Sequence, residues 1–207
     1  SAISGYAQLA RSNPKYCDRL IEVAINQVER AQRITSSLST LAGSSQVERR
    51  PIELFDLIES TLLLMEKELQ RFDVILSNQL DDRMPSVMGD RGQLQQVFFN
   101  LILNAAQSIT NNGRILLRYE VSEDNVAVFI DDNGRGIAEH VKTRIYDPFY
   151  TTKGALGSSE EPGTGLGLSF VCNILNELGG GVELVESKLG GSCFKVSVPH
   201  IHSSVKE

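Results

Sequence analysis

Three segments of the sequence carry polar residues and glycines at spacings that suit purine and phosphate chemistry. They are QVFFNLILNAAQSI from Gln96 to Ile109, DDNGRGI from Asp131 to Ile137, and GTGLGLS from Gly163 to Ser169. Each segment alone is compatible with a turn or a helix surface. Together they offer a metal-binding amide, a carboxylate that can read a base, and a glycine loop for phosphates. The ordered set therefore predicts a site for ATP and Mg²⁺.

The first segment is predicted to lie on a long helix from Asp90 to Thr110. Asn100 and Asn104 are four residues apart, so both amides project from one face of that helix. An apolar row beside them marks the edge of buried space. An asparagine carbonyl oxygen suits Mg²⁺, which keeps several waters and bridges to phosphates. The alternative is that both residues are ordinary surface amides.

The second segment follows the predicted strand NVAVFI, and Gly134 and Gly136 remove side chains around its acidic residue. A carboxylate only accepts hydrogen bonds, so it suits the exocyclic amino group of adenine and opposes the carbonyl oxygen of guanine. Such a charged hydrogen bond contributes about 1.5–3 kcal/mol, which is enough to prefer ATP to GTP. A plain Asp-Asn-Gly turn is the alternative.

The third segment opens a predicted helix, and its three glycines let backbone N–H groups approach phosphate oxygens at a helix N-terminus. It is neither a P-loop nor a dinucleotide fingerprint. Between the second and third segments lies YDPFYTTKGALGSSEEPG, in which Phe149 is predicted to be an anchor and Lys153 to meet phosphate. Residues 154–162 are small and polar, as in a mobile lid, or in an inert surface loop.

The elements that position these segments mix helical and strand patterns. Helices are predicted over LFDLIESTLLLMEKEL, Asp90–Thr110 and Gly167–Leu178, and strands over DVILSNQL, RILLRYEV, NVAVFIDD, VELVES and SCFKVSVP. The predicted fold class is α+β. A helical hairpin precedes a two-layer α/β sandwich that has a mixed sheet with helices on one face.

The N-terminal part predicts the hairpin. From Cys17 to Leu41 apolar residues recur at steps of four and three, with a second apolar row one residue over, and Ile3–Arg11 is also helical. Two adjoining rows are wider than one helix partner needs, so we expect a homodimer with a four-helix bundle. An intramolecular helix pair packed on the next domain is the alternative. The predicted domains are a truncated hairpin at 1–43, a linker at 44–51, a catalytic domain at 52–200 and a tail at 201–207.

Composition excludes several other classes. The chain has 207 residues, a net charge of −6 and a pI near 5.2, so it lacks the basic footprint of a nucleic-acid binder. No apolar run is long enough for a membrane span. The three cysteines, Cys17, Cys172 and Cys193, are odd in number and far apart. They suit a reducing compartment, so a cytoplasmic location is expected, although a membrane-anchored parent protein is equally compatible.

The motifs, in this order and at this spacing, resemble the catalytic ATP-binding domain of sensor histidine kinases, of the Bergerat or GHKL superfamily. The resemblance implies the Bergerat fold, with Asn104 on Mg²⁺, Asp132 on adenine and a lid between Phe149 and Gly163. DNA gyrase B subunits, MutL-type ATPases and heat-shock chaperones share that fold, but the sequences of the DPFYTTK and GTGLGL motifs favour the kinases. The implied nucleotide-binding residues are Asn100, Asn104, Asp132, Gly134, Gly136, Ile137, Phe149, Lys153, Gly163, Thr164, Gly165, Leu166, Gly167 and Leu168.

The resemblance extends to SAISGYAQLA at the N-terminus, which is similar to the segment that follows the phosphoacceptor histidine in the dimerisation helix. That histidine would lie about two helical turns before Ser1, so the chain would hold the phosphate donor without the acceptor. The implied activity is transfer of the ATP γ-phosphoryl group to the histidine and then to an aspartate of a response-regulator receiver domain. Two other hypotheses remain: a nucleotide-gated dimerisation module without catalysis, and a GHKL clamp ATPase. Gln107, where some family members carry a basic residue, departs from the pattern.

Overall fold

The computed structural model describes residues 2–17, 20–21, 24, 48–152 and 163–201. The chain divides into two compact units, Ser1–Ser45 and Gln46–Glu207. In the first unit, α1 (Ala2–Ser12) is followed by the short 3-10 helix η1 (Pro14–Tyr16). The Asn13 side chain caps η1 by accepting a hydrogen bond of 3.0 Å from the Lys15 amide. The rest of the predicted hairpin lies largely outside the described residues, so its dimerisation stays a prediction.

A five-stranded mixed sheet is the centre of the second unit. Its strand order is β2-β4-β5-β7-β6, in which β2 pairs parallel with β4 and the other pairs are antiparallel. The strands are β2 (Val74–Asn78), β4 (Gly113–Val121), β5 (Asn125–Asp132), β6 (Gly181–Val185) and β7 (Cys193–Pro199).

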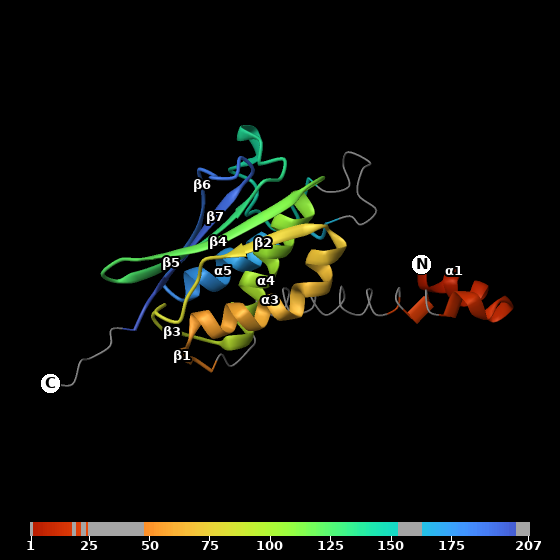
Figure 1. Cartoon of the computed structure of the whole chain (residues 1–207), viewed down its shortest axis with the longest axis horizontal. Helices are drawn as coiled ribbons and strands as arrows, with labels where there is room; N and C mark the ends of the chain where they lie inside the picture. Colours follow the sequence, from red (N-terminus) through yellow and green to blue (C-terminus); the bar gives the residue numbers. More distant parts are fainter. Residues whose placement is uncertain (1, 18–19, 22–23, 25–47, 153–162, 202–207) are drawn as a thin grey trace. The chain divides into compact units, whose positions relative to one another are not determined.

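Three helices lie together on one side of this sheet, as Figure 1 shows. They are α3 (Leu54–Arg71), α4 (Arg91–Ser108) and α5 (Gly167–Glu177). Helix α4 lies between the other two, packs against both, and contacts β4 and β5. Its N-terminus is capped by Asp90, whose carboxylate accepts from the Gln93 amide at 2.9 Å. The central helix thus carries the two asparagines into the layer between helices and sheet.

The sheet has two chemically different faces because side chains alternate along each strand. On β5, Val126, Val128 and Ile130 join the main hydrophobic core under the helices. Ala127 and Phe129 belong to a small separate cluster with Cys193 on the other face. This alternation decides which of the residues at the end of β5 faces the helices.

A second, two-stranded sheet joins β1 (Arg50–Ile52) antiparallel to β3 (Val87–Gly89). The sequence patterns did not predict either strand, and two residues of the predicted linker belong to β1. Pro51 is tolerated because β1 has a single neighbouring strand. The last strand β7 ends beside this sheet, where His200 forms an isolated bridge with Val87.

The predicted fold class is confirmed for the second unit, which is an α+β sandwich of three helices on a mixed sheet. Every strand and helix predicted between residues 52 and 200 is present, with ends that differ by at most two residues. A short 3-10 helix, η2 (Glu139–Val141), was not predicted. Among the helices of the described residues, none combines the length and the apolar character needed to cross a lipid bilayer.

Candidate functional site

The two aspartates at the end of β5 point to opposite faces of the sheet. Both are buried, with exposures of 0% for Asp131 and 1% for Asp132. Asp132 follows Ile130 by two residues and therefore shares the helix-covered face, where its carboxylate meets Ser108 at the end of α4. Asp131 lies on the face of Phe129. Of these two aspartates, only Asp132 is on the side of Asn100 and Asn104.

The two oxygens of Asp132 have different surroundings. Oδ1 accepts hydrogen bonds from the Gly134 amide at 2.8 Å, the Ser108 hydroxyl at 3.1 Å and the Ser192 amide at 3.2 Å. Within the described part of the chain, no residue donates to Oδ2. Burial raises the pKa of Asp132 above the usual aspartate value, and its three donors oppose that rise. The carboxylate is therefore held by one oxygen and offers the other to a ligand.

Glycines make room for this carboxylate. A Cβ atom on Gly134 would collide with the Ser108 hydroxyl and stand 2.8 Å from Asp132 Oδ1. A Cβ atom on Gly191 would collide with the same Oδ1 and stand 2.5 Å from the Asp132 carbonyl oxygen. Gly136 has φ +69°, a backbone conformation that favours glycine. Gly134 and Gly191 thus allow close packing around Asp132, and sequence reasoning missed Gly191.

Helix α4 joins the Asp132 end of the site to its other end. Asn100, Asn104 and Ser108 are spaced by four residues and lie on one face of the helix. Each step of four residues advances about 6 Å along the axis. Ser108 contacts Asp132 at one end of this row. The helix therefore sets the distance between the Asp132 carboxylate and the two asparagine amides.

The glycine loop meets the asparagines at the other end of the row. A Cβ atom placed on Gly167, the first residue of α5, would lie 3.8 Å from Asn100 Cγ and 3.9 Å from Asn104 Nδ2. Asn100 is 8% exposed, and its Nδ2 donor has no hydrogen-bond partner among the described residues. The N-terminus of α5 has no side-chain cap. A buried free donor beside an uncapped helix N-terminus fits a phosphate group.

Phe149 and Gly165 come together through their backbones. The Phe149 amide donates to the Gly165 carbonyl at 2.9 Å, and a Cβ atom on Gly165 would stand 2.7 Å from Phe149 Cα. The prediction that Phe149 is an anchor is wrong, because its side chain is 68% exposed. Its backbone, at φ 65°, makes the contact instead. Lys153 and most of the predicted lid lie outside the described residues.

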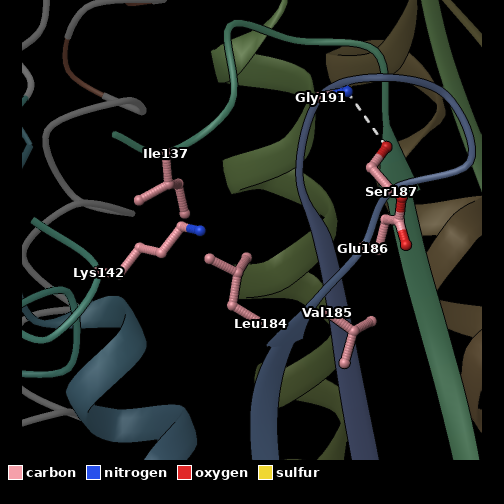
Figure 2. A pocket seen from close by; sticks show the side chains of 7 residues that line it. All are labelled: Ile137, Lys142, Leu184, Val185, Glu186, Ser187 and Gly191. Atoms are coloured by element: carbon pink, nitrogen blue, oxygen red, sulfur yellow. Dashed lines mark hydrogen bonds between the residues drawn. The ribbon is translucent and has the colours of Figure 1, made fainter. Parts of the chain in front are cut away.

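The remaining predicted residues have varied positions. Leu166 is buried, Leu168 packs on the core, and Gly163 and Thr164 are half-buried. Ile137 packs on the core and also lines a cavity of about 370 Å³ between the DDNGRGI segment and β6. Figure 2 shows this cavity, which does not include Asp132 or the asparagines. Its lining residues are Ile137, Lys142, Leu184, Val185, Glu186, Ser187 and Gly191.

Sequence reasoning missed four residues that shape the site: Ser108, Ser187, Gly191 and Ser192. Ser108 had a readable signal, since it continues the four-residue spacing of the asparagines. The other three lie in the β6–β7 loop, at least 55 residues from the aspartates they contact. No local pattern indicates a contact over that separation.

Comparison with known proteins identifies the family of this chain. Residues 89–202 match the family model "Histidine kinase-, DNA gyrase B-, and HSP90-like ATPase". The signal transduction histidine-protein kinase AtoS of Escherichia coli strain K12 is 29% identical over 203 residues, which cover 96% of this chain and 32% of AtoS. The nucleotide-free catalytic domain of histidine kinase ThkA is 30% identical, with a TM-score of 0.62, and the match covers 74% of this chain and 98% of that domain.

A longer ThkA structure, in complex with the response regulator protein TrrA, is 24% identical and has a TM-score of 0.69. That match covers 97% of this chain and 57% of the ThkA chain. At this identity it shows a shared fold. The chain spans about a third of the length of the curated relatives it matches. The chain therefore belongs to the histidine kinase-, DNA gyrase B- and HSP90-like ATPase family, and its second unit is the nucleotide-binding catalytic domain of a sensor histidine kinase.

Proposed function

We propose that this chain binds ATP with Mg²⁺ and serves as the phosphate donor of a two-component sensor kinase. The observation that carries this proposal is the row on α4. A base-reading carboxylate stands at the Ser108 end, and two amides meet a glycine loop at the Asn100 end. The two ends suit the two ends of one nucleotide. In this assignment, adenine lies at Asp132 and the phosphates lie at Gly167.

The adenine end is selective because Asp132 Oδ1 is already saturated by protein donors. Oδ2 is left to accept the exocyclic amino group of adenine. A guanine carbonyl oxygen at that place would face a second acceptor and leave both unpaired in a buried site. The burial that raises the pKa of Asp132 also lowers the local dielectric, which strengthens the hydrogen bond to the base.

At the phosphate end, this chain offers hydrogen-bond donors for phosphate oxygens and a carbonyl oxygen for Mg²⁺. The unpartnered Asn100 Nδ2 and the backbone N–H groups at the start of α5 would hold phosphate oxygens. Asn104 would supply a carbonyl oxygen to Mg²⁺, which neutralises phosphate charge when bound. Lys153 remains a predicted phosphate contact. The work of these residues is positioning and charge stabilisation, the main contributions to phosphoryl transfer.

The kinase assignment draws on the relatives. AtoS is named a histidine-protein kinase, and ThkA was solved with a response regulator. By likeness to them, the γ-phosphoryl group would pass to a histidine and then to an aspartate of a receiver domain. The N-terminal hairpin would form the homodimer. ATP use and the three unpaired cysteines favour the cytoplasm.

Two measurements test this proposal. In calorimetry with Mg²⁺, the 207-residue chain should bind ATP about tenfold or more tightly than GTP, because one charged hydrogen bond is at stake. With γ-labelled ATP, the chain alone should gain no acid-labile phosphate, while a longer protein that includes the histidine helix should. Equal binding of ATP and GTP would overturn the adenine assignment. Steady ATP hydrolysis without any phosphoprotein in the longer form would favour the clamp ATPase.

A further inference from the structure

Asp131 is fully buried on the sheet face that does not hold the nucleotide, so the proposed function gives it no role. A buried carboxylate needs hydrogen-bond partners, and among the described residues those of the Asp131 side chain come from one loop. Its Oδ1 accepts from the Ser187 hydroxyl at 2.6 Å, and its Oδ2 accepts from the Lys188 amide at 2.8 Å. A longer contact of 3.4 Å comes from the Leu189 amide. Asp131 therefore fixes the start of the β6–β7 loop.

Ser187 connects this carboxylate to the rest of the loop. While its hydroxyl donates to Asp131, its oxygen accepts from the Leu189 amide at 3.1 Å, the Gly190 amide at 2.9 Å and the Gly191 amide at 3.1 Å. Figure 2 shows the last of these contacts as a dashed line. A hydroxyl has one donor and two acceptor lone pairs, so the three amides share two lone pairs and leave this oxygen no spare acceptor capacity. One side chain thereby shapes the loop up to Gly191.

The end of the same loop holds Asp132. The Gly191 amide donates to the Asp132 carbonyl at 3.0 Å, and the Ser192 amide donates to its carboxylate Oδ1 at 3.2 Å. The Asp132 amide in turn donates to the Ser192 carbonyl at 2.8 Å. Gly191 is so close that a Cβ atom would collide with the Asp132 carboxylate. A small displacement of the loop would therefore move or release Oδ1.

We propose that Asp131 and Ser187 are positioning residues for base recognition. From the opposite face of the sheet they hold the 187–192 loop, and through it they hold the Asp132 carboxylate in the orientation that presents Oδ2 to adenine. This proposal rests on the proposed function, in which Asp132 reads the adenine amino group. It makes nucleotide selectivity depend on two residues that do not touch the nucleotide.

The test is Ser187→Ala in the full 207-residue chain. Binding of ATP is compared with binding of purine riboside triphosphate, which lacks only the amino group of adenine. The wild type should prefer ATP by roughly tenfold or more, and Ser187→Ala should reduce that ratio by about threefold or more. Affinity for purine riboside triphosphate should stay within about twofold, because the phosphate end is unchanged. Ser187→Thr should restore the ratio, since it keeps the hydroxyl and the adjoining cavity leaves space for a methyl group.

Ser122→Ala is the matched control. The Ser122 hydroxyl also closes a turn, by donating to the Asn125 carbonyl at 3.0 Å, but at the other end of β5. Its loss should leave the ratio at the wild-type value. Asp131→Asn is a second variant for the same selectivity ratio, because it retains the side-chain volume while placing an amide donor among the loop donors.

The outcomes separate the two proposals. A wild-type preference that survives Ser187→Ala would overturn the positioning role alone. So would a uniform loss of affinity for both nucleotides, since that is what a merely structural residue would produce. A wild-type chain that binds both nucleotides equally would overturn the reading of adenine by Asp132, and the positioning role with it.

Discussion

At the scale of single residues, the site depends on an unequal use of two oxygens. Asp132 Oδ1 takes three protein donors and Oδ2 takes none from the described residues. This arrangement fixes the carboxylate without consuming its capacity to bind a ligand. Without nucleotide, this arrangement leaves a buried charge, which is unfavourable for stability. The same burial raises the pKa of Asp132. Function and stability therefore oppose each other at this residue.

The variant Asp132→Asn is expected to weaken ATP binding without lowering the stability of the fold. An acid whose folded pKa is raised contributes stability below its unfolded pKa, and that contribution is lost as pH rises through the folded value. At pH 7 the wild-type charge therefore destabilises the fold, so Asp132→Asn should melt no lower than the wild type. ATP affinity should fall roughly tenfold to a hundredfold, because an amide donor replaces an acceptor.

Thermal melts with and without ATP and Mg²⁺ would check this expectation. At the same ATP concentration, ATP should raise the melting temperature of the wild type by more than that of Asp132→Asn. The exposed Asp82→Asn serves as the control and should behave as the wild type. A variant that melts well below the wild type, yet is stabilised by ATP as much as the wild type, would contradict the assignment.

At the scale of elements, side-chain clusters hold two of the loops on the sheet, and one of them is the β6–β7 loop held by Asp131 and Ser187. The β2–β3 connection illustrates this away from the nucleotide. Asp81 accepts from the Tyr119 hydroxyl of β4 at 2.7 Å and from Arg83 at 2.5 Å. Hydrogen bonds from Arg83 and then Tyr119 lower the pKa of Asp81 from its usual 3.8 to about 2. The ionised carboxylate is thus the form that holds this loop on the sheet.

The stability of the fold should therefore depend on pH through Asp81. A carboxyl group with a depressed folded pKa contributes stability above its unfolded pKa of 3.8, and the contribution is lost as pH falls toward 2. Asp81→Asn should lower the urea midpoint at pH 6, and the two proteins should converge as pH approaches 2. Tyr119→Phe should show a smaller loss in the same direction. A difference between wild type and Asp81→Asn that does not change with pH would show that charge is not the cause.

At the scale of the whole molecule, the chain separates nucleotide binding from its N-terminal helices. The sheet, its three helices and every described residue of the candidate site lie in Gln46–Glu207. One face of the sheet builds the core and the candidate nucleotide site. The other face carries Asp131 and its loop partners. We therefore expect this unit to bind the nucleotide by itself, and the predicted role of residues 1–43 is association.

Removal of the first unit should test this division. A chain that begins at Gln46 is expected to bind ATP within about twofold of the full chain, because every described residue of the candidate site lies in Gln46–Glu207. It should also sediment as a monomer, whereas the full chain should sediment as a dimer. Calorimetry and analytical ultracentrifugation provide the two measurements. Loss of ATP binding in the shorter chain would show that the units are coupled.

The sequence by itself predicted a nucleotide ligand and most of the helices and strands, because both predictions rest on patterns of neighbouring residues. The four-residue spacing of Asn100 and Asn104 is a property of one helix, and a carboxylate after a strand is a property of one strand end. Helices and strands of five residues or more repeat their apolar pattern often enough to be read. The three-residue strands β1 and β3 do not, and they were missed.

Only the tertiary structure decided which groups surround each functional residue. It showed that the backbone of Phe149, and not its side chain, meets Gly165. It placed Asp131 and Asp132 on opposite faces, because alternation has meaning only once the helices cover one face. It also brought Ser187 to Asp131 across 56 positions of the chain. Contacts at that separation arise from packing and strand order, which no local pattern of residues contains.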